Sequence, residues 1–155
     1  MHLFDDTPLV GVHNTIQAAM GWRNYHLWAF RRERQVVATN NEDDPAGVRA
    51  GRKQLKSFLR AQGQELEYVY DFGDWWRHRL THEGVVEREG RKRYPRCVDG
   101  ARACPPEDCG GVPGYERVVR TPWSGRYAHY DPERFDLRAT NWHVHDLTLR
   151  GGVRC

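Results

Sequence analysis

Residues Glu65–His82 read ELEYVYDFGDWWRHRLTH, and this stretch decides the fold. In its first half, apolar and aromatic side chains occupy every second position, which is the period of a half-buried β-strand: Leu66, Tyr68, Tyr70 and Phe72. Gly73 and Asp74 follow, with glycine first as a two-residue type II′ turn prefers. The alternation then resumes, and one face is made of Trp76, His78, Leu80 and His82. The stretch therefore predicts a β-hairpin.

The rest of the chain supplies further strands and helices. Residues 26–30 (HLWAF) and 35–38 are apolar enough to predict a second pair of strands. Cap residues, apolar spacing and glycine stops predict helices from Asn14 to Met20, from Asp43 or Asp44 to Gly63, from Gly114 to Val119, and from Asp131 onward. We therefore predict an α+β fold with one domain over residues 1–150 and a loose tail at 151–155. Its small, mostly antiparallel sheet carries helices on one face and is closed by a Cys/Pro/Gly-rich loop.

Composition narrows the class of protein. Of the 155 residues, 39% are hydrophobic and 29% charged, which is typical of a globular domain. No apolar run approaches the ~20 residues of a membrane helix. The N-terminus carries Asp5 and Asp6 where a signal peptide would carry basic residues. These features predict a cytoplasmic protein.

The Cys/Pro/Gly-rich loop is residues 94–115, YPRCVDGARACPPEDCGGVPGY. In a reducing compartment, clustered thiols are zinc ligands or buried apolar side chains more often than disulfide partners. As a structural zinc site, Cys97, Cys104 and Cys109 would take His78 as the fourth ligand. Other candidates for that fourth ligand are His82, His129, His143, His145 and Cys155. The alternative is that the prolines and glycines fix the loop and the thiols only fill space.

A cationic run leads directly into this loop and is the best candidate for contacts with nucleic-acid phosphates: Arg88, Arg91, Lys92, Arg93 and Arg96. Arg77 and Arg79 lie on the outward face of the second hairpin strand, beside Trp75, which is a candidate for stacking on bases. The net charge is only +3, so the run is also compatible with an ordinary solvated surface.

Chemistry, if present, is expected at Asp71 and His78, with Glu107 and Asp108 as loop acids, in a metal-dependent site. No recombinase or kinase site is evident. Neither serine of the chain, Ser57 or Ser124, has the arginine-rich setting of a serine recombinase. The Asp-Phe-Gly triplet after the first hairpin strand lacks the other kinase motifs. A non-catalytic protein is therefore favoured, with the metal-dependent enzyme as the alternative.

Two motifs together, YVYDFGDWWRH (68–78) and the loop at 94–115, resemble the Ri-plasmid ORF-three-like family, whose members also occur as TnpR-like passengers of insertion elements. The resemblance includes AAMGWRNYHLWAF (18–30) and DPERFDL (131–137), and spans residues 13–142. It implies an α+β domain and an accessory role in plasmids, phages or insertion elements.

The chain departs from the family pattern at two places. It begins MHLFDDTPL, without the first strand that carries a Pro-x-x-Trp-Arg-Arg-like segment, and the stretch before DPERF is shortened. A missing first strand would leave one sheet edge open, and an open edge can pair with another chain. A protein-interaction module, pairing with itself or with another protein through this edge, is therefore a further alternative.

Overall fold

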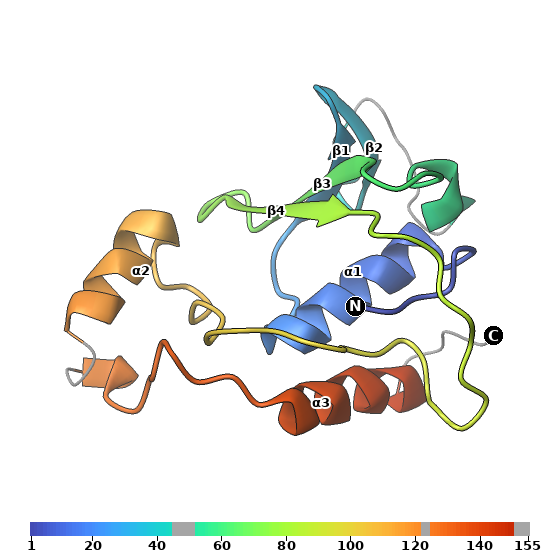
Figure 1. Ribbon diagram of the computed structural model, residues 1–155. Coiled ribbons are helices and arrows are strands. Elements are labelled where there is room, and N and C mark those ends of the chain that lie inside the picture. The colour runs from blue at the N-terminus through green and yellow to red at the C-terminus, as the bar shows by residue number, and fades with distance from the viewer. Residues whose placement is uncertain (45–51, 122–124, 151–155) are drawn as a thin grey trace.

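The computed structural model describes residues 1–44, 52–121 and 125–150. Its helices are α1 (Leu9–Met20), α2 (Gly111–Arg120) and α3 (Leu137–Arg150), and its strands are β1 (Trp28–Arg32), β2 (Gln35–Thr39), β3 (Glu65–Tyr70) and β4 (Trp76–Thr81). Helix α1 lies between the sheet and α3, whereas α2 stands beside the loop that joins β3 to β4 (Figure 1). The predicted α+β class is confirmed. The predicted tail lies outside the described residues.

The four strands form one antiparallel sheet in the order β2-β1-β3-β4, so β2 and β4 are its edges. The predicted hairpin is confirmed by the pairing of β3 with β4. The predicted two-residue turn is wrong, because Tyr70 pairs with Trp76 and residues 71–75 form the loop. Asp71 explains the wider loop: its Oδ1 accepts the backbone N–H groups of Gly73 and Asp74. Pairing of another chain with either edge stays a prediction.

The core lies between α1 and the sheet. The most deeply buried side chains come mainly from these two layers, with one from α3: Leu9, Val12, His13, Gln17, Phe30, Leu66, Tyr68, Val69, Tyr70 and Val144. Two of these most deeply buried side chains are polar, and both reach from α1 to Tyr68 of β3: His13 Nδ1 lies 2.7 Å from Tyr68 Oη and Gln17 Nε2 lies 3.0 Å from it. Hydrogen bonding offsets the cost of removing these groups from water.

Several helix boundaries differ from the predictions. Helix α1 begins at Leu9 rather than at Asn14, and it ends at Met20 as predicted, followed by Gly21, whose φ of 73° is left-handed as in a glycine cap. Helix α2 contains the predicted segment. Helix α3 begins at Leu137, so the predicted start at Asp131 is wrong. Asp136 is its cap, because Asp136 Oδ1 accepts the N–H of Arg138 and of Ala139.

The helix predicted between Asp43 and Gly63 is also wrong in its described part, where no residue is α-helical and a 3₁₀ turn forms at Leu55–Ser57. The backbone of this segment bonds to the N-terminal residues instead. Leu55 N–H donates to Thr7 O at 2.9 Å, and Lys56 N–H donates to Asp5 O at 2.7 Å. These bonds occupy backbone N–H groups that an α-helix would use for its own hydrogen bonds. Residues 45–51 of the predicted helix lie outside the described part of the chain.

No helix in the described residues is long and apolar enough to cross a membrane.

Candidate functional site

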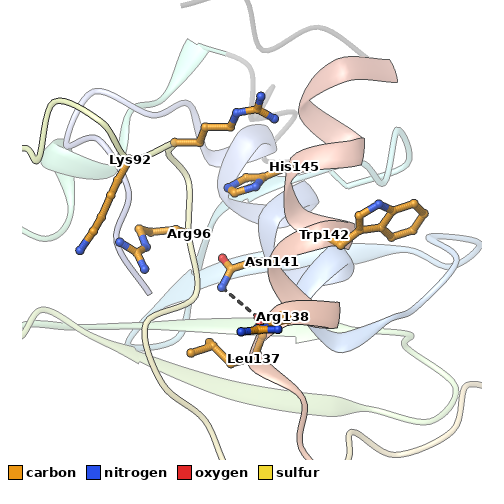
Figure 2. A pocket seen from close by; sticks show the side chains of 8 residues that line it. Lys92, Arg96, Leu137, Arg138, Asn141, Trp142 and His145 are labelled. Atoms are coloured by element: carbon orange, nitrogen blue, oxygen red, sulfur yellow. Dashed lines mark hydrogen bonds between the residues drawn. The ribbon is translucent and has the colours of Figure 1, made fainter.

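A groove of about 470 Å³ lies between residues 92–96 and one face of α3. Its lining residues are Lys92, Arg93, Arg96, Leu137, Arg138, Asn141, Trp142 and His145. In Figure 2 the side chains of Lys92 and Arg96 extend from the loop on one side, and those of Arg138, Asn141 and His145 come from α3 on the other. We call this feature the cationic groove.

Two sets of backbone contacts hold the loop side of the cationic groove in place. Asn141 makes reciprocal bonds with Cys97: Cys97 N–H donates to Asn141 Oδ1, and Asn141 Nδ2 donates to Cys97 O, each at 2.9 Å. On the other side, Arg96 exchanges two backbone bonds with His2, at 2.8 and 3.0 Å. The loop is therefore fastened both to α3 and to the N-terminal segment at Arg96 and Cys97, at the end of its cationic run.

The side chains that line the cationic groove carry charge of one sign, and Lys92 is paired with Glu89 next to the lining, Nζ to Oε2 2.5 Å. Four of its eight lining side chains are cationic, and none is a carboxylate. Trp142 is 63% exposed, and its ring extends to the side of α3 away from Lys92 and Arg96 (Figure 2). Guanidinium groups present planar, paired donors that match phosphate oxygens. The arrangement can bind a polyanion and stack on a flat ring.

The structure gathers only part of the predicted nucleic-acid set in this groove: Lys92, Arg93 and Arg96. Arg88 lies over the ring of Phe4, 5.6 Å from its centroid, and Arg91 is exposed outside the lining. Trp75 lies in the β3–β4 loop against Phe72.

Arg77 and Arg79 are on the outer face of the sheet. The outer face of the sheet is separated from α3 by α1 (Figure 1). Arg77 Nε donates to Glu67 Oε1 at 2.6 Å, and Arg79 lies 3.7 Å from Glu65. These two arginines therefore face neighbouring carboxylates, not the cationic groove.

Sequence reasoning missed the contribution of α3. Arg138, Asn141, Trp142 and His145 follow the spacing i, i+3, i+4, i+7, which places them on one helix face. That spacing is visible in the sequence, and a tryptophan on a polar helix face could have indicated a binding surface. The sequence does not show which other segment lies beside this face.

The thiols of the three loop cysteines each have a different neighbour. Cys97 Sγ donates to Asp99 O at 3.2 Å, Cys104 Sγ lies 3.2 Å from Met20 Sδ, and Cys109 Sγ lies 3.9 Å from Gly111 O. Burial, with a smaller contribution from Cys97, raises the pKa of the Cys104 thiol to about 11. Such a thiol is harder to ionise for metal binding. The zinc site of these cysteines and His78 stays a prediction.

His78 packs into the core instead of facing Asp71. Its ring lies 5.5 Å from that of Trp22 and 5.4 Å from that of Tyr68, measured between centroids. Burial lowers the pKa of His78 and so favours the neutral ring. The structure therefore does not bring His78 and Asp71 together as a pair.

Asp71 lies with a different imidazole and with one of the predicted loop acids. Within the described residues, one set of three or more His, Cys, Asp or Glu side chains has ligand atoms within 4.8 Å of one another, and it is His26, Asp71 and Asp108. His26 Nε2 is 2.9 Å from Asp108 Oδ1 and 3.6 Å from Asp71 Oδ2. The other loop acid, Glu107, bonds to the Tyr70 hydroxyl at 2.6 Å.

Comparison with known proteins gives the family. The model of the plasmid pRiA4b ORF-3-like proteins matches residues 1–139. The uncharacterized protein y4hQ of Sinorhizobium fredii is 36% identical over 153 residues, covering 90% of this chain and 78% of that protein. The crystal structure of MM3350 from Methanosarcina mazei Go1, a protein of unknown function, superposes with a TM-score of 0.73 at 29% identity, covering 88% of this chain and 84% of that one. This chain therefore belongs to the plasmid pRiA4b ORF-3-like family.

Proposed function

We propose that this protein is a non-catalytic accessory protein of plasmids and other mobile elements, and that it binds the backbone of a nucleic acid in the cationic groove. The observation that supports this proposal is the lining of the groove, which holds four cationic side chains and no carboxylate. Lys92 pairs with Glu89, which is not a lining residue, and the arginines Arg93, Arg96 and Arg138 carry the proposal. The family's association with a plasmid supports the genetic setting.

Binding would draw on two kinds of contact. Neutralising phosphates with Arg93, Arg96 and Arg138 releases condensed counterions, which makes affinity fall steeply as salt rises. Trp142 adds an exposed ring across α3 from the loop cations, within reach of a strand that continues past the helix (Figure 2). Sequence-independent binding of single strands combines a cationic track with aromatic stacking. Single-stranded nucleic acid is therefore the favoured ligand, because the bases of a duplex are not free to stack on Trp142.

The double variant Arg93→Ala/Arg138→Ala is expected to lower affinity for a fluorescein-labelled single-stranded oligonucleotide at least about tenfold at low salt. It should also reduce the slope of log K against log salt by about 1.4, since about 0.7 of slope is lost with each single-strand phosphate contact. Fluorescence anisotropy between about 50 and 200 mM salt measures both quantities. Both side chains are exposed, so the fold should be unaffected.

The matched control is Arg77→Ala/Arg79→Ala, which removes the same charge from the outer face of the sheet. We expect its affinity to stay close to that of the unmodified protein, because these arginines lie beside Glu67 and Glu65. If both double variants lost the same affinity, the loss would come from the change in net charge, and binding in the cationic groove would be contradicted. Absence of binding at about 50 mM salt would remove the proposal.

Trp142→Ala tests the preference for single strands. Loss of one stacked base costs about 1–3 kcal/mol, so affinity for the single strand should fall about tenfold. Affinity for a duplex of the same sequence should change little, because its bases stay stacked on one another. Anisotropy titrations with the two ligands at one salt concentration give the comparison. A similar loss with both ligands would show that Trp142 supports the groove and does not contact bases.

A further inference from the structure

We propose that His26, Asp71 and Asp108 bind one divalent metal ion at the base of the β3–β4 loop. This site is independent of the proposed nucleic-acid binding. The β3–β4 loop lies at the end of the molecule near α2 (Figure 1). The cationic groove is lined by residues 92–96 and α3, which lie away from that end. The two sites can therefore be tested and lost separately.

The three side chains converge from distant parts of the chain. His26 precedes β1, Asp71 follows β3, and Asp108 belongs to the Cys/Pro/Gly-rich loop. Their ligand atoms lie within 4.8 Å of one another. One imidazole nitrogen and two carboxylate oxygens are a donor set used for Zn²⁺ and other divalent transition ions. An imidazole between two carboxylates differs from a surface patch of acids, since the three groups surround one point.

Asp71 is positioned before any ion arrives. The residue is only 7% exposed, and its Oδ1 accepts backbone N–H groups from Gly73 at 2.9 Å and Asp74 at 3.3 Å. These bonds fix the carboxylate and leave Oδ2 directed at His26 Nε2, 3.6 Å away and beyond hydrogen-bond distance. A carboxylate this buried needs a positive partner. Hydrogen bonds from neighbouring groups to a metal-binding carboxylate orient it and contribute to the affinity for the metal ion.

The segment that carries Asp108 is also fastened down. The side chain of Arg126 donates to Asp108 O. The neighbouring Glu107 accepts from the Tyr70 hydroxyl at 2.6 Å and from Arg23 N–H at 2.8 Å. The loop thus meets the end of β3 and the segment before β1 at fixed points. The position of the Asp108 carboxylate is set by these contacts, which lowers the entropic cost of ordering it around an ion.

The cluster of His26, Asp71 and Asp108 is open to solvent on one side. The side chain of Asp108 is 57% exposed and that of His26 is 31% exposed, so water can complete the coordination of an ion held by three protein groups. An imidazole ligates a metal ion in its neutral form.

Titration of metal-stripped protein with Mn²⁺, followed by calorimetry and by the electron paramagnetic resonance of free Mn²⁺, tests the site. Mn²⁺ favours oxygen and imidazole over thiolate, so the cysteines compete little. We expect one saturable equivalent. Asp71→Asn and Asp108→Asn should each weaken binding at least about tenfold. Asp74→Asn is the matched control, because Asp74 lies in the same loop, binds Gly110 N–H and supplies no ligand, so binding should stay within about threefold.

Three results would overturn the proposal: no saturable binding below about 1 mM Mn²⁺, equal weakening by Asp108→Asn and Asp74→Asn, or loss of binding in Cys104→Ser. Asp108 is exposed, so its variant reports on the ion even where Asp71→Asn disturbs folding. Oligonucleotide affinity, measured in parallel, should be unchanged in Asp108→Asn. A loss there would instead connect the cluster to the cationic groove.

Discussion

Replacing Gly114 with alanine should lower the free energy of unfolding by at least about 3 kcal/mol, the upper part of the range for overpacking. Gly114 lies in the first turn of α2, where an added Cβ would fall 1.7 Å from Cys109 O and 2.5 Å from Cys109 C. Both are backbone atoms, so no side-chain rotation relieves the contact. Helix propensity alone predicts the opposite sign, a gain of about 1 kcal/mol for glycine to alanine.

Urea denaturation followed by tryptophan fluorescence measures the change, and Gly90→Ala is its control. A Cβ at Gly90 meets nothing within 4 Å, so that substitution should change the free energy of unfolding by less than about 0.5 kcal/mol. If the two variants unfolded at the same urea concentration, the close approach of α2 to Cys109 would be contradicted.

The second large effect is a loss of stability in acid caused by His13. Burial, only partly offset by the hydrogen bond to Asn24, lowers the pKa of His13 from 6.5 to about 4. A histidine with a depressed pKa binds its proton more readily when unfolded. Its contribution is therefore complete above pH 6.5 and is lost as pH falls toward 4. A shift of this size corresponds to about 3 kcal/mol.

The hydrogen bonds of His13 support the neutral ring. Gln17 Nε2 donates to the Tyr68 hydroxyl, which leaves the Tyr68 O–H to donate to His13 Nδ1. His13 Nε2 then carries the proton and donates to Asn24 Oδ1 at 2.9 Å. The ring also stacks on Trp28, 4.3 Å between centroids. A second proton on Nδ1 would place two donors face to face, so protonation and this network are incompatible.

Urea denaturation at about pH 7.5 and pH 4.5 tests this, with His13→Gln beside the unmodified protein. The variant should be less stable at the higher pH, yet it should lose about 2.5 kcal/mol less between the two pH values, since it no longer titrates. His129→Gln removes an exposed histidine and should keep the pH dependence of the unmodified protein. The same pH dependence in His13→Gln and in His129→Gln would contradict a buried neutral His13. The pKa of His78, lowered by burial, adds acid sensitivity of the same sign in all three proteins.

What the sequence predicted well is local. The alternation of residues 65–82 identified β3 and β4 because the direction of strand side chains repeats every two residues. The turn failed because a side chain, Asp71, took the backbone N–H groups that a tighter turn would leave free. The helix predicted from Asp43 failed for a nonlocal reason, since its backbone groups pair with residues 5–9.

In the candidate sites, too, residues that are close in sequence were predicted, and partners that are distant in sequence were missed. The loop half of the cationic groove was found because its cations are contiguous, whereas Arg138 and Trp142 come from a helix far along the chain. His78 was paired with Asp71 because the two are close in sequence. The sheet directs His78 into the core, and the imidazole that reaches Asp71 is His26, which lies far from it in sequence. Spacing along one segment could not reveal that partner.

One loop connects the two ends of the molecule. It leaves the cationic groove at Cys97, whose backbone is bonded to Asn141, and reaches the cluster at Asp108. Between them, Trp22 Nε1 donates to Pro105 O at 2.9 Å, and Ala103 N–H donates to Pro132 O at 2.9 Å. An inserted or deleted residue would shift every later residue of the loop away from its hydrogen-bond partner. Related proteins should therefore vary this loop by substitution while keeping its length.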